Sequence, residues 1–96
     1  MYRIFKCEPN KLGYVKEINS NLEALQNEVG GYIQCLPLFD NVVLIVDEEG
    51  RLKNKEFSFY LPSYGDIVGD AFFIGTKDED FISLTDEQIE ILEKRF

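Results

Sequence analysis

The stretch VVLIVDEEG, from Val42 to Gly50, limits the fold more than any other part of the chain. Its first five residues, Val42–Val46, are an unbroken apolar run rich in β-branched side chains, which is typical of an inner strand buried on both faces. The acidic residues and the glycine that follow predict a tight turn, in which Gly50 supplies a positive φ. We therefore expect a sheet that is covered on both sides.

Further extended segments lie on both sides of this strand in the sequence. A turn-forming run, Pro9–Gly13, lies between two extended segments, Tyr2–Cys7 and Tyr14–Ile18. This arrangement predicts an N-terminal hairpin. Leu52–Gly65 is the least regular segment, although apolar residues alternate between Phe57 and Leu61. The other predicted strands are Tyr32–Leu38, Asn41–Asp47, Asp70–Thr76 and a short one at Phe81–Ile82.

A short helix is predicted after the N-terminal hairpin. Ser20 and Glu23 have the spacing of a capping box, in which each side chain satisfies a free backbone N–H at the start of a helix. Gly30 predicts its end, in the left-handed conformation that a C-cap requires. The apolar face of this helix is formed by Leu22, Leu25 and Val29.

A second helix is predicted at the end of the chain. Thr85 and Gln88 form another capping box, and acidic residues occupy the first turn, where the helix dipole favours them. The apolar face comprises Ile89, Leu92 and Phe96. The predicted order β-β-α-β-β-β-(β)-α indicates a single α+β domain over residues 1–96, with two helices and a mostly antiparallel sheet of about five to six strands.

Acidic residues accumulate in the last third of the chain. Residues 66–96 contain nine of the eighteen acidic residues but only three basic ones, so this part carries −6 of the net charge of −8. Phosphate binding needs clustered lysine and arginine, so we expect no direct nucleic-acid contact. The opposite role is attractive, because an acidic surface can imitate phosphates and occupy a basic groove. The candidate partner-binding acids are Asp78, Glu79, Asp80, Asp86, Glu87, Glu90 and Glu93.

An aromatic segment offers a second candidate for partner binding. Tyr60 and Tyr64 are large side chains with a polar end, the type that concentrates energy in interfaces. The alternative interpretation of the same segment is structural, with Phe57 and Phe59 lining the core from an edge strand.

The residue types do not favour catalysis. The chain has no histidine, so a serine–histidine or cysteine–histidine pair cannot form, and no pattern places two carboxylates in one cleft. Cys7 and Cys35 are expected to be small core residues. The alternatives are a disulfide between them, or a zinc site that combines either cysteine with carboxylates. We predict a protein without enzymatic activity, catalytic residues or a cofactor.

Several motifs together resemble a family of small domains of unknown function, encoded by phages and mobile elements. The motifs are VGGYI at Val29–Ile33, the strand and acidic turn at Val43–Gly50, and SLTDEQI at Ser83–Ile89. They follow one another in the family's order over nearly the whole chain. The resemblance implies a phage or prophage protein in a bacterial cytoplasm, and it brings no catalytic residues. Blocking bacterial defence systems is one task of such proteins.

These observations lead to one favoured hypothesis and two alternatives. The favoured one is a phage protein that inhibits a bacterial defence protein, such as a CRISPR nuclease, by placing its acidic surface in a nucleic-acid-binding groove. One alternative is a module that sequesters an anionic nucleotide signal between protomers of a homo-oligomer, using Arg3, Arg51 or a lysine. The other is a structural or regulatory accessory protein. No apolar run approaches the roughly 20 residues of a membrane helix, so we expect a cytoplasmic protein without membrane contact.

Overall fold

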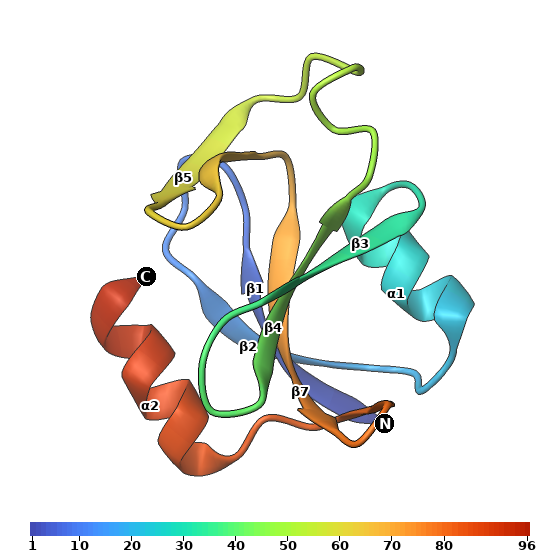
Figure 1. Ribbon diagram of the computed structural model, residues 1–96, viewed down its shortest axis with the longest axis vertical. Coiled ribbons are helices and arrows are strands. Elements are labelled where there is room, and N and C mark those ends of the chain that lie inside the picture. The colour runs from blue at the N-terminus through green and yellow to red at the C-terminus, as the bar shows by residue number, and fades with distance from the viewer.

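One antiparallel sheet separates the two helices in the computed structural model, which describes residues 1–96 (Figure 1). The chain forms two helices and eight strands, so the predicted α+β class is confirmed. Helix α1 (Leu22–Val29) covers one face of the sheet, and helix α2 (Asp86–Arg95) lies at the other face. The prediction that the sheet is covered on both sides is therefore confirmed.

The main sheet has five strands in the order β2-β1-β7-β4-β3, and a sixth strand, β8, pairs with the end of β7. All these pairs are antiparallel. The bounds are β1 Tyr2–Cys7, β2 Tyr14–Ile18, β3 Ile33–Pro37, β4 Val42–Asp47, β7 Ala71–Lys77 and β8 Asp80–Ile82. Strands β2 and β3 are the free edges, and every residue of β4 is buried, as its apolar run predicted.

A second, two-stranded sheet was not predicted. Strand β5 (Phe57–Leu61) and strand β6 (Gly65–Val68) form a hairpin, whose turn is closed by the Tyr64 N–H bonding to the Leu61 carbonyl at 3.0 Å. Pro62 suits the second position of this turn because its ring fixes φ. Gly65, directly after the turn, adopts a positive φ of 84°. Both Phe57 and Phe59 were considered as core residues, and a register irregularity between them explains why only one of them is. Phe59 packs on the core as expected, whereas Phe57 is 52% exposed.

Helix α1 begins one residue later than the capping box at Ser20 predicted. Its N-cap is Asn21, whose side-chain oxygen accepts from the Ala24 N–H at 2.8 Å. Leu22 is consequently the first helical residue and is 56% exposed, so its predicted burial is wrong. The helix ends as predicted, with Gly30 in the left-handed conformation at φ 75°.

Helix α2 follows the sequence prediction closely. The Thr85 and Gln88 side chains form the reciprocal capping box, and Ile89 and Leu92 are buried. Phe96, directly after the helix, packs against Phe59 and Phe73 with ring centroids 5.0 and 5.1 Å apart. This aromatic group fixes the end of α2 beside the β5–β6 hairpin.

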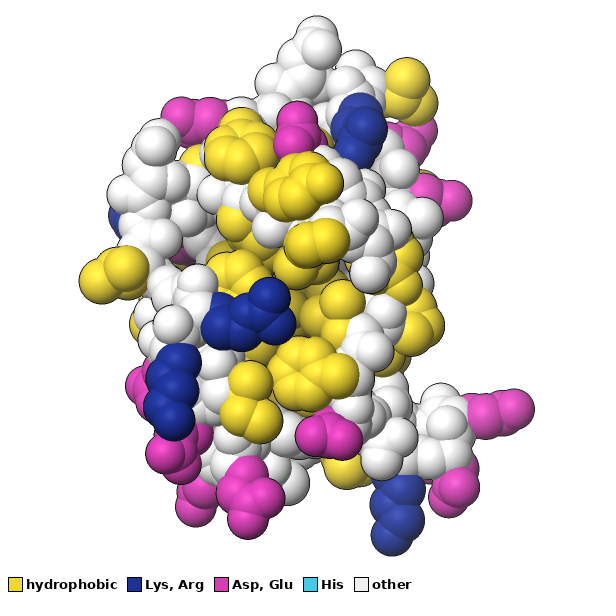
Figure 2. Space-filling model, turned by 60° about the vertical axis from the view of Figure 1, so that its left-hand side comes forward, with side chains coloured by type: hydrophobic (Ala, Val, Ile, Leu, Met, Phe, Trp, Pro, Cys, Tyr) yellow, Lys and Arg dark blue, Asp and Glu magenta, His cyan; other side chains and the backbone are white.

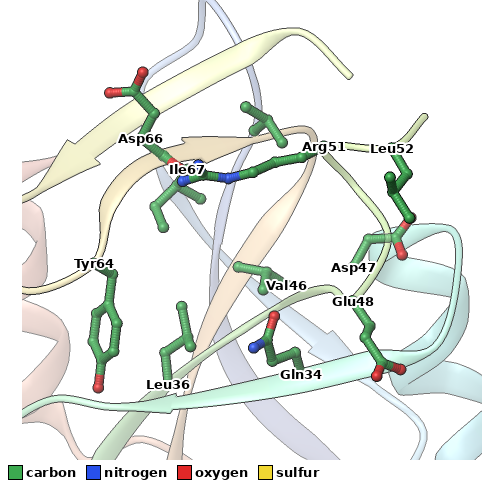
Figure 3. Close-up of a pocket in the computed structure, with 11 residues that line it drawn as sticks. Gln34, Leu36, Val46, Asp47, Glu48, Arg51, Leu52, Tyr64, Asp66 and Ile67 are labelled. Atoms are coloured by element: carbon green, nitrogen blue, oxygen red, sulfur yellow. Dashed lines mark hydrogen bonds between the residues drawn. The ribbon is translucent and has the colours of Figure 1, made fainter. Parts of the chain in front are cut away.

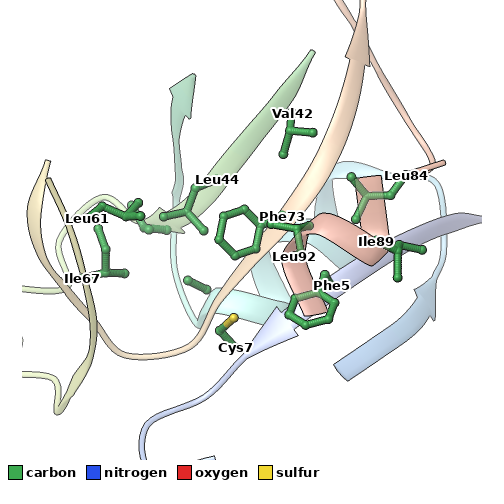
Figure 4. Close-up of a cluster of buried hydrophobic side chains, with 12 residues drawn as sticks. Phe5, Cys7, Val42, Leu44, Leu61, Ile67, Phe73, Leu84, Ile89 and Leu92 are labelled. Carbon is green, nitrogen blue, oxygen red and sulfur yellow. The ribbon is translucent and has the colours of Figure 1, made fainter. Parts of the chain in front are cut away.

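The core lies on both faces of the main sheet, because alternate side chains of one strand point to opposite sides. Val42, Leu44 and Val46 face α2 and the β5–β6 hairpin, in the cluster drawn in Figure 4. Val43 and Ile45 pack in the second cluster, with Leu25 and Val29 of α1.

The turn after β4 differs from its prediction. Gly50 does not adopt a positive φ. A Cβ at this position would instead make tight contacts, 3.2 Å from a methyl group of Val68 and 3.3 Å from the Asp47 carbonyl oxygen. The positive φ in this loop belongs to Asn54, at 54°.

Candidate functional site

The acidic residues of α2 lie on its solvent-exposed side. Asp86, Glu87, Glu90 and Glu93 are all exposed, because Ile89 and Leu92 turn the opposite face to the core. Two of these carboxylates have cations nearby. Asp86 pairs with Arg3 at 2.8 Å, and Glu90 lies 3.9 Å from Lys94. Glu87 and Glu93 make no ion pair, so this helix presents accessible negative charge.

The other predicted acids form a separate group. Asp78 and Glu79 occupy the turn between β7 and β8, and Asp80 begins β8; all three are exposed and unpaired. Asp78 takes φ 57°, which aspartate tolerates in a tight turn. Figure 1 places this hairpin beside the N-terminus, with α2 on the other side of the molecule. The seven acids therefore form two groups rather than one continuous patch.

The two candidate tyrosines lie on the β5–β6 hairpin. Tyr60 is 59% exposed on β5, opposite Asp66. Tyr64 is 36% exposed, and its hydroxyl donates to the Pro37 carbonyl at 2.6 Å. Tyr60 is thus a free aromatic side chain, whereas Tyr64 links the hairpin to strand β3.

The end of α2 adjoins this hairpin through a shallow apolar hollow that sequence reasoning missed. Arg95 lines a hollow of about 280 Å³ together with Pro62 and Tyr64. The Arg95 side chain forms no ion pair or hydrogen bond. Figure 2 shows the hydrophobic area of this face, a basic side chain within it, and acidic side chains along its lower edge. The hollow's other residues come from β3, from the loop after it, and from β5 and its turn: Pro37, Leu38, Phe39, Leu61 and Ser63.

Asp47 is a buried carboxylate that sequence reasoning did not single out. Its side chain is 1% exposed and lies 2.8 Å from the Lys53 ammonium and 2.7 Å from that of Lys55. Burial alone would raise its pKa, but hydrogen bonds from both lysines and from the Glu49 N–H lower the pKa well below its usual range. The sequence indicated this burial, because alternation along the strand places Asp47 on the same face as the core residues Val43 and Ile45.

These two lysines also cap helix α1. Lys55 donates to the Val29 carbonyl at 2.6 Å, and Lys53 lies 3.3 Å from the Gly30 carbonyl oxygen. Cations at a helix C-terminus are favourable, because the last carbonyls lack backbone partners. Asp47 therefore ties the β4–β5 loop to the end of α1.

A second buried ion pair holds the other side of α1. Lys6 on β1 lies 2.8 Å from the Glu28 carboxylate, which also accepts from Lys16 of β2 at 3.0 Å. Burial acts to raise the Glu28 pKa, but the hydrogen bonds from Lys6 and Lys16 outweigh it and lower the pKa. The side chains of Lys6, Lys16 and Glu28 therefore bond to one another and hold α1 against strands β1 and β2.

The basic residues considered for an anionic ligand are engaged in the same way. Arg3 binds Asp86 and the Leu84 carbonyl, and Arg51 donates to the Asp66 carbonyl at 2.8 Å. Arg51 lines a pocket, but it shares that pocket with the carboxylates of Asp47, Glu48 and Asp66. The structure therefore does not assemble the predicted basic pocket within one protomer.

The two cysteines do not lie together. Cys7 is a core residue, as expected, and burial raises the pKa of its thiol to about 12. Cys35 is exposed on β3, so its predicted burial is wrong, because β3 is an edge strand. Strands β7 and β4 separate the two, which excludes a disulfide between them in this fold. No group of three or more Cys, Asp or Glu side chains is placed to hold a metal ion, and neither helix is long and apolar enough to cross a membrane.

A family model for a domain of unknown function, DUF3846, matches residues 2–96. The chain belongs to the DUF3846 family. Its VGGYI and acidic-turn motifs have a structural explanation in this DUF3846 domain, because a Cβ on Gly31 would lie only 2.6 Å from the Asp47 carboxylate. No curated protein and no solved structure matches the chain.

Proposed function

We propose that this DUF3846 domain is a non-enzymatic phage or prophage protein that inhibits a bacterial defence protein, of the CRISPR nuclease class. Its acidic surface would occupy the basic groove that normally holds nucleic acid. One observation carries the proposal: α2, whose exposed side is acidic, meets the β5–β6 hairpin at its C-terminal end, where Arg95 lies beside Pro62 and Tyr64. Charged and aromatic groups thus lie close together, as partner surfaces require.

The charge distribution supports this proposal in preference to an anion-binding module. The net charge is −8, and the basic side chains of the first 65 residues already bond to carboxylates or backbone carbonyls. Glu87 and Glu93, in contrast, remain free to meet cations of a partner. The β7–β8 acids would contact a second part of a large groove, or serve only to steer association.

A phage-protection assay tests the proposal. Bacteria that carry a defined CRISPR or restriction system are challenged with phage while they express the domain. We expect plating efficiency to rise for the wild type with at least one CRISPR system and to return toward the defended level for Glu87→Gln, Glu90→Gln and Glu93→Gln combined.

The matched control neutralises three acids elsewhere, Glu17, Glu23 and Glu49, which are exposed and make no ion pair. This variant changes the net charge by the same amount, and we expect it to protect the phage as the wild type does. Protection that survives neutralisation of all seven candidate acids, or no protection in any strain, would contradict the proposal.

A further inference from the structure

A pocket lies over the paired strands β3 and β4, between them and the β5–β6 hairpin. It has a volume of about 270 Å³ (Figure 3). Gln34 and Leu36 of β3 point into it from one side, Ile67 of β6 from the other, and Val46 forms its floor. Strand β3 ends the main sheet, so its outer backbone edge is unpaired next to the residues that line the pocket, and β6 pairs only with β5.

The register identifies which backbone groups of β3 face away from the sheet. The Glu48 N–H donates to the Tyr32 carbonyl, and the Leu38 N–H donates to the Val42 carbonyl. In an antiparallel ladder these bonds recur at every second residue, so Ile33, Cys35 and Pro37 direct their N–H and C=O groups outward. The Tyr64 hydroxyl, which binds the Pro37 carbonyl at 2.6 Å, agrees with this assignment.

Both edges are capped at one point only, and by side chains. Tyr64 reaches from the hairpin to the Pro37 carbonyl of β3, and Arg51 reaches to the Asp66 carbonyl of β6. Pro37 has no N–H to offer, which shortens the usable edge. The N–H and C=O groups of Ile33 and Cys35 remain unpaired, which gives an added strand its hydrogen-bonding partners.

The charges at the pocket specify the chemistry of the occupant. Glu48 and Asp66 are exposed there without a cation in ion-pair distance, and Asp47 is neutralised by its two lysines. Arg51 also lines the pocket but donates to the Asp66 carbonyl, so the two free carboxylates outnumber the one remaining cation. Leu36, Val46 and Ile67 form the apolar part of the lining. An occupant should therefore place an apolar side chain in the pocket and a lysine or arginine near Glu48 or Asp66. A second copy of this chain would instead bring another net charge of −8.

We propose that strand β3 binds an extended basic segment of a partner protein, which adds a strand to the main sheet and inserts an apolar side chain between β3 and β6. Backbone hydrogen bonds to Ile33 and Cys35 would contribute binding energy that does not depend on the sequence of the bound segment. The pocket and its two carboxylates would select the sequence. This site is separate from the acidic face of α2 and does not depend on it.

A positional-scanning library of short extended peptides is the probe for this site. We expect it to select lysine or arginine alternating with an apolar residue. A selected peptide should bind Cys35→Pro at least about tenfold more weakly, because proline removes the outward N–H and its ring obstructs the added strand. The matched control is Glu17→Pro on β2, the opposite edge strand, which should change affinity by less than about twofold.

Hydrogen exchange in the unmodified protein gives a second readout that does not require a variant to fold. The Ile33 and Cys35 amides should exchange more slowly when the selected peptide is bound. The proposal is overturned if selection yields acidic peptides or none, or if Cys35→Pro binds like the wild type while folded. Protection confined to other amides, or a β3-mediated homodimer in sedimentation, would overturn it as well.

Discussion

Gly31 and Asp47 are separated by a strand and a turn in the sequence, but they meet at the end of α1. Asp47 is held by Lys53 and Lys55, which also bind the last carbonyls of the helix. The space that the carboxylate needs exists only because residue 31 has no side chain. The consecutive glycines of the VGGYI motif thus have different causes, a left-handed φ at Gly30 and a close approach at Gly31.

Gly31→Ala should destabilise the protein by about 1–3 kcal/mol, because its Cβ would collide with the Asp47 carboxylate. In an Asp47→Ser background the loss should be smaller by about 1 kcal/mol or more, since the shorter side chain leaves room. Urea unfolding of the four proteins measures this coupling.

The control for this cycle is Gly30→Ala. This substitution should lower the free energy of unfolding by about 1–2 kcal/mol in both backgrounds, because the loss comes from placing alanine in a left-handed backbone conformation and not from the Asp47 carboxylate. Equal losses for Gly31→Ala with and without Asp47 would refute the explanation of the motif.

Single residues were the hardest to place from the sequence. The outward position of Phe57 depends on a local register irregularity, and the exposure of Cys35 depends on β3 being an edge strand. Neither is visible in a pattern of neighbouring residues, because strand order is set by contacts between distant segments. Asp47 could have been found, since it falls at a core position of an apolar strand.

At the scale of elements, the two helices show what a local signal can predict. The capping box that Thr85 and Gln88 predicted for helix α2 is confirmed. Before α1 three residues of capping type, Asn19, Ser20 and Asn21, stand side by side, and Asn21 rather than Ser20 takes the role. Strand β6 was missed because it is short and contains only two apolar residues, Ile67 and Val68, so that its pairing with β5 defines it.

Alanine substitutions distinguish the two candidate caps of α1. Asn21→Ala should lower the free energy of unfolding by about 1 kcal/mol, because the Ala24 N–H loses its partner. Ser20→Ala should change it by less than about 0.5 kcal/mol, since the Ser20 hydroxyl makes no hydrogen bond. Thermal or urea denaturation of both variants measures the difference, and a larger effect at Ser20 would reverse the assignment.

At the scale of the whole molecule, the charge pattern is organised by the two layers that flank the sheet. The layer with α1 uses its lysines and carboxylates in buried ion pairs. The layer with α2 and the β5–β6 hairpin carries exposed acids beside an apolar hollow. The sequence predicted the excess of acids but not their division into two groups, because that division depends on where β8 and α2 lie around the sheet.

The proposed mechanism requires the domain and nucleic acid to compete for one groove. Screening should weaken the binding of the domain to the groove as salt rises from about 0.05 to 0.3 M, because exposed charges interact over only about a Debye length. Replacing Glu87, Glu90 and Glu93 with glutamine should also weaken the binding of the domain to the groove, by at least about tenfold.

Displacement of labelled duplex DNA from the inhibited nuclease, followed by fluorescence anisotropy, is the most direct measurement. We expect the wild type and the variant neutralised at Glu17, Glu23 and Glu49 to release the DNA at similar concentrations, and the α2 variant to require far more protein. A ternary complex, in which the nuclease holds the domain and the DNA together, would contradict the account.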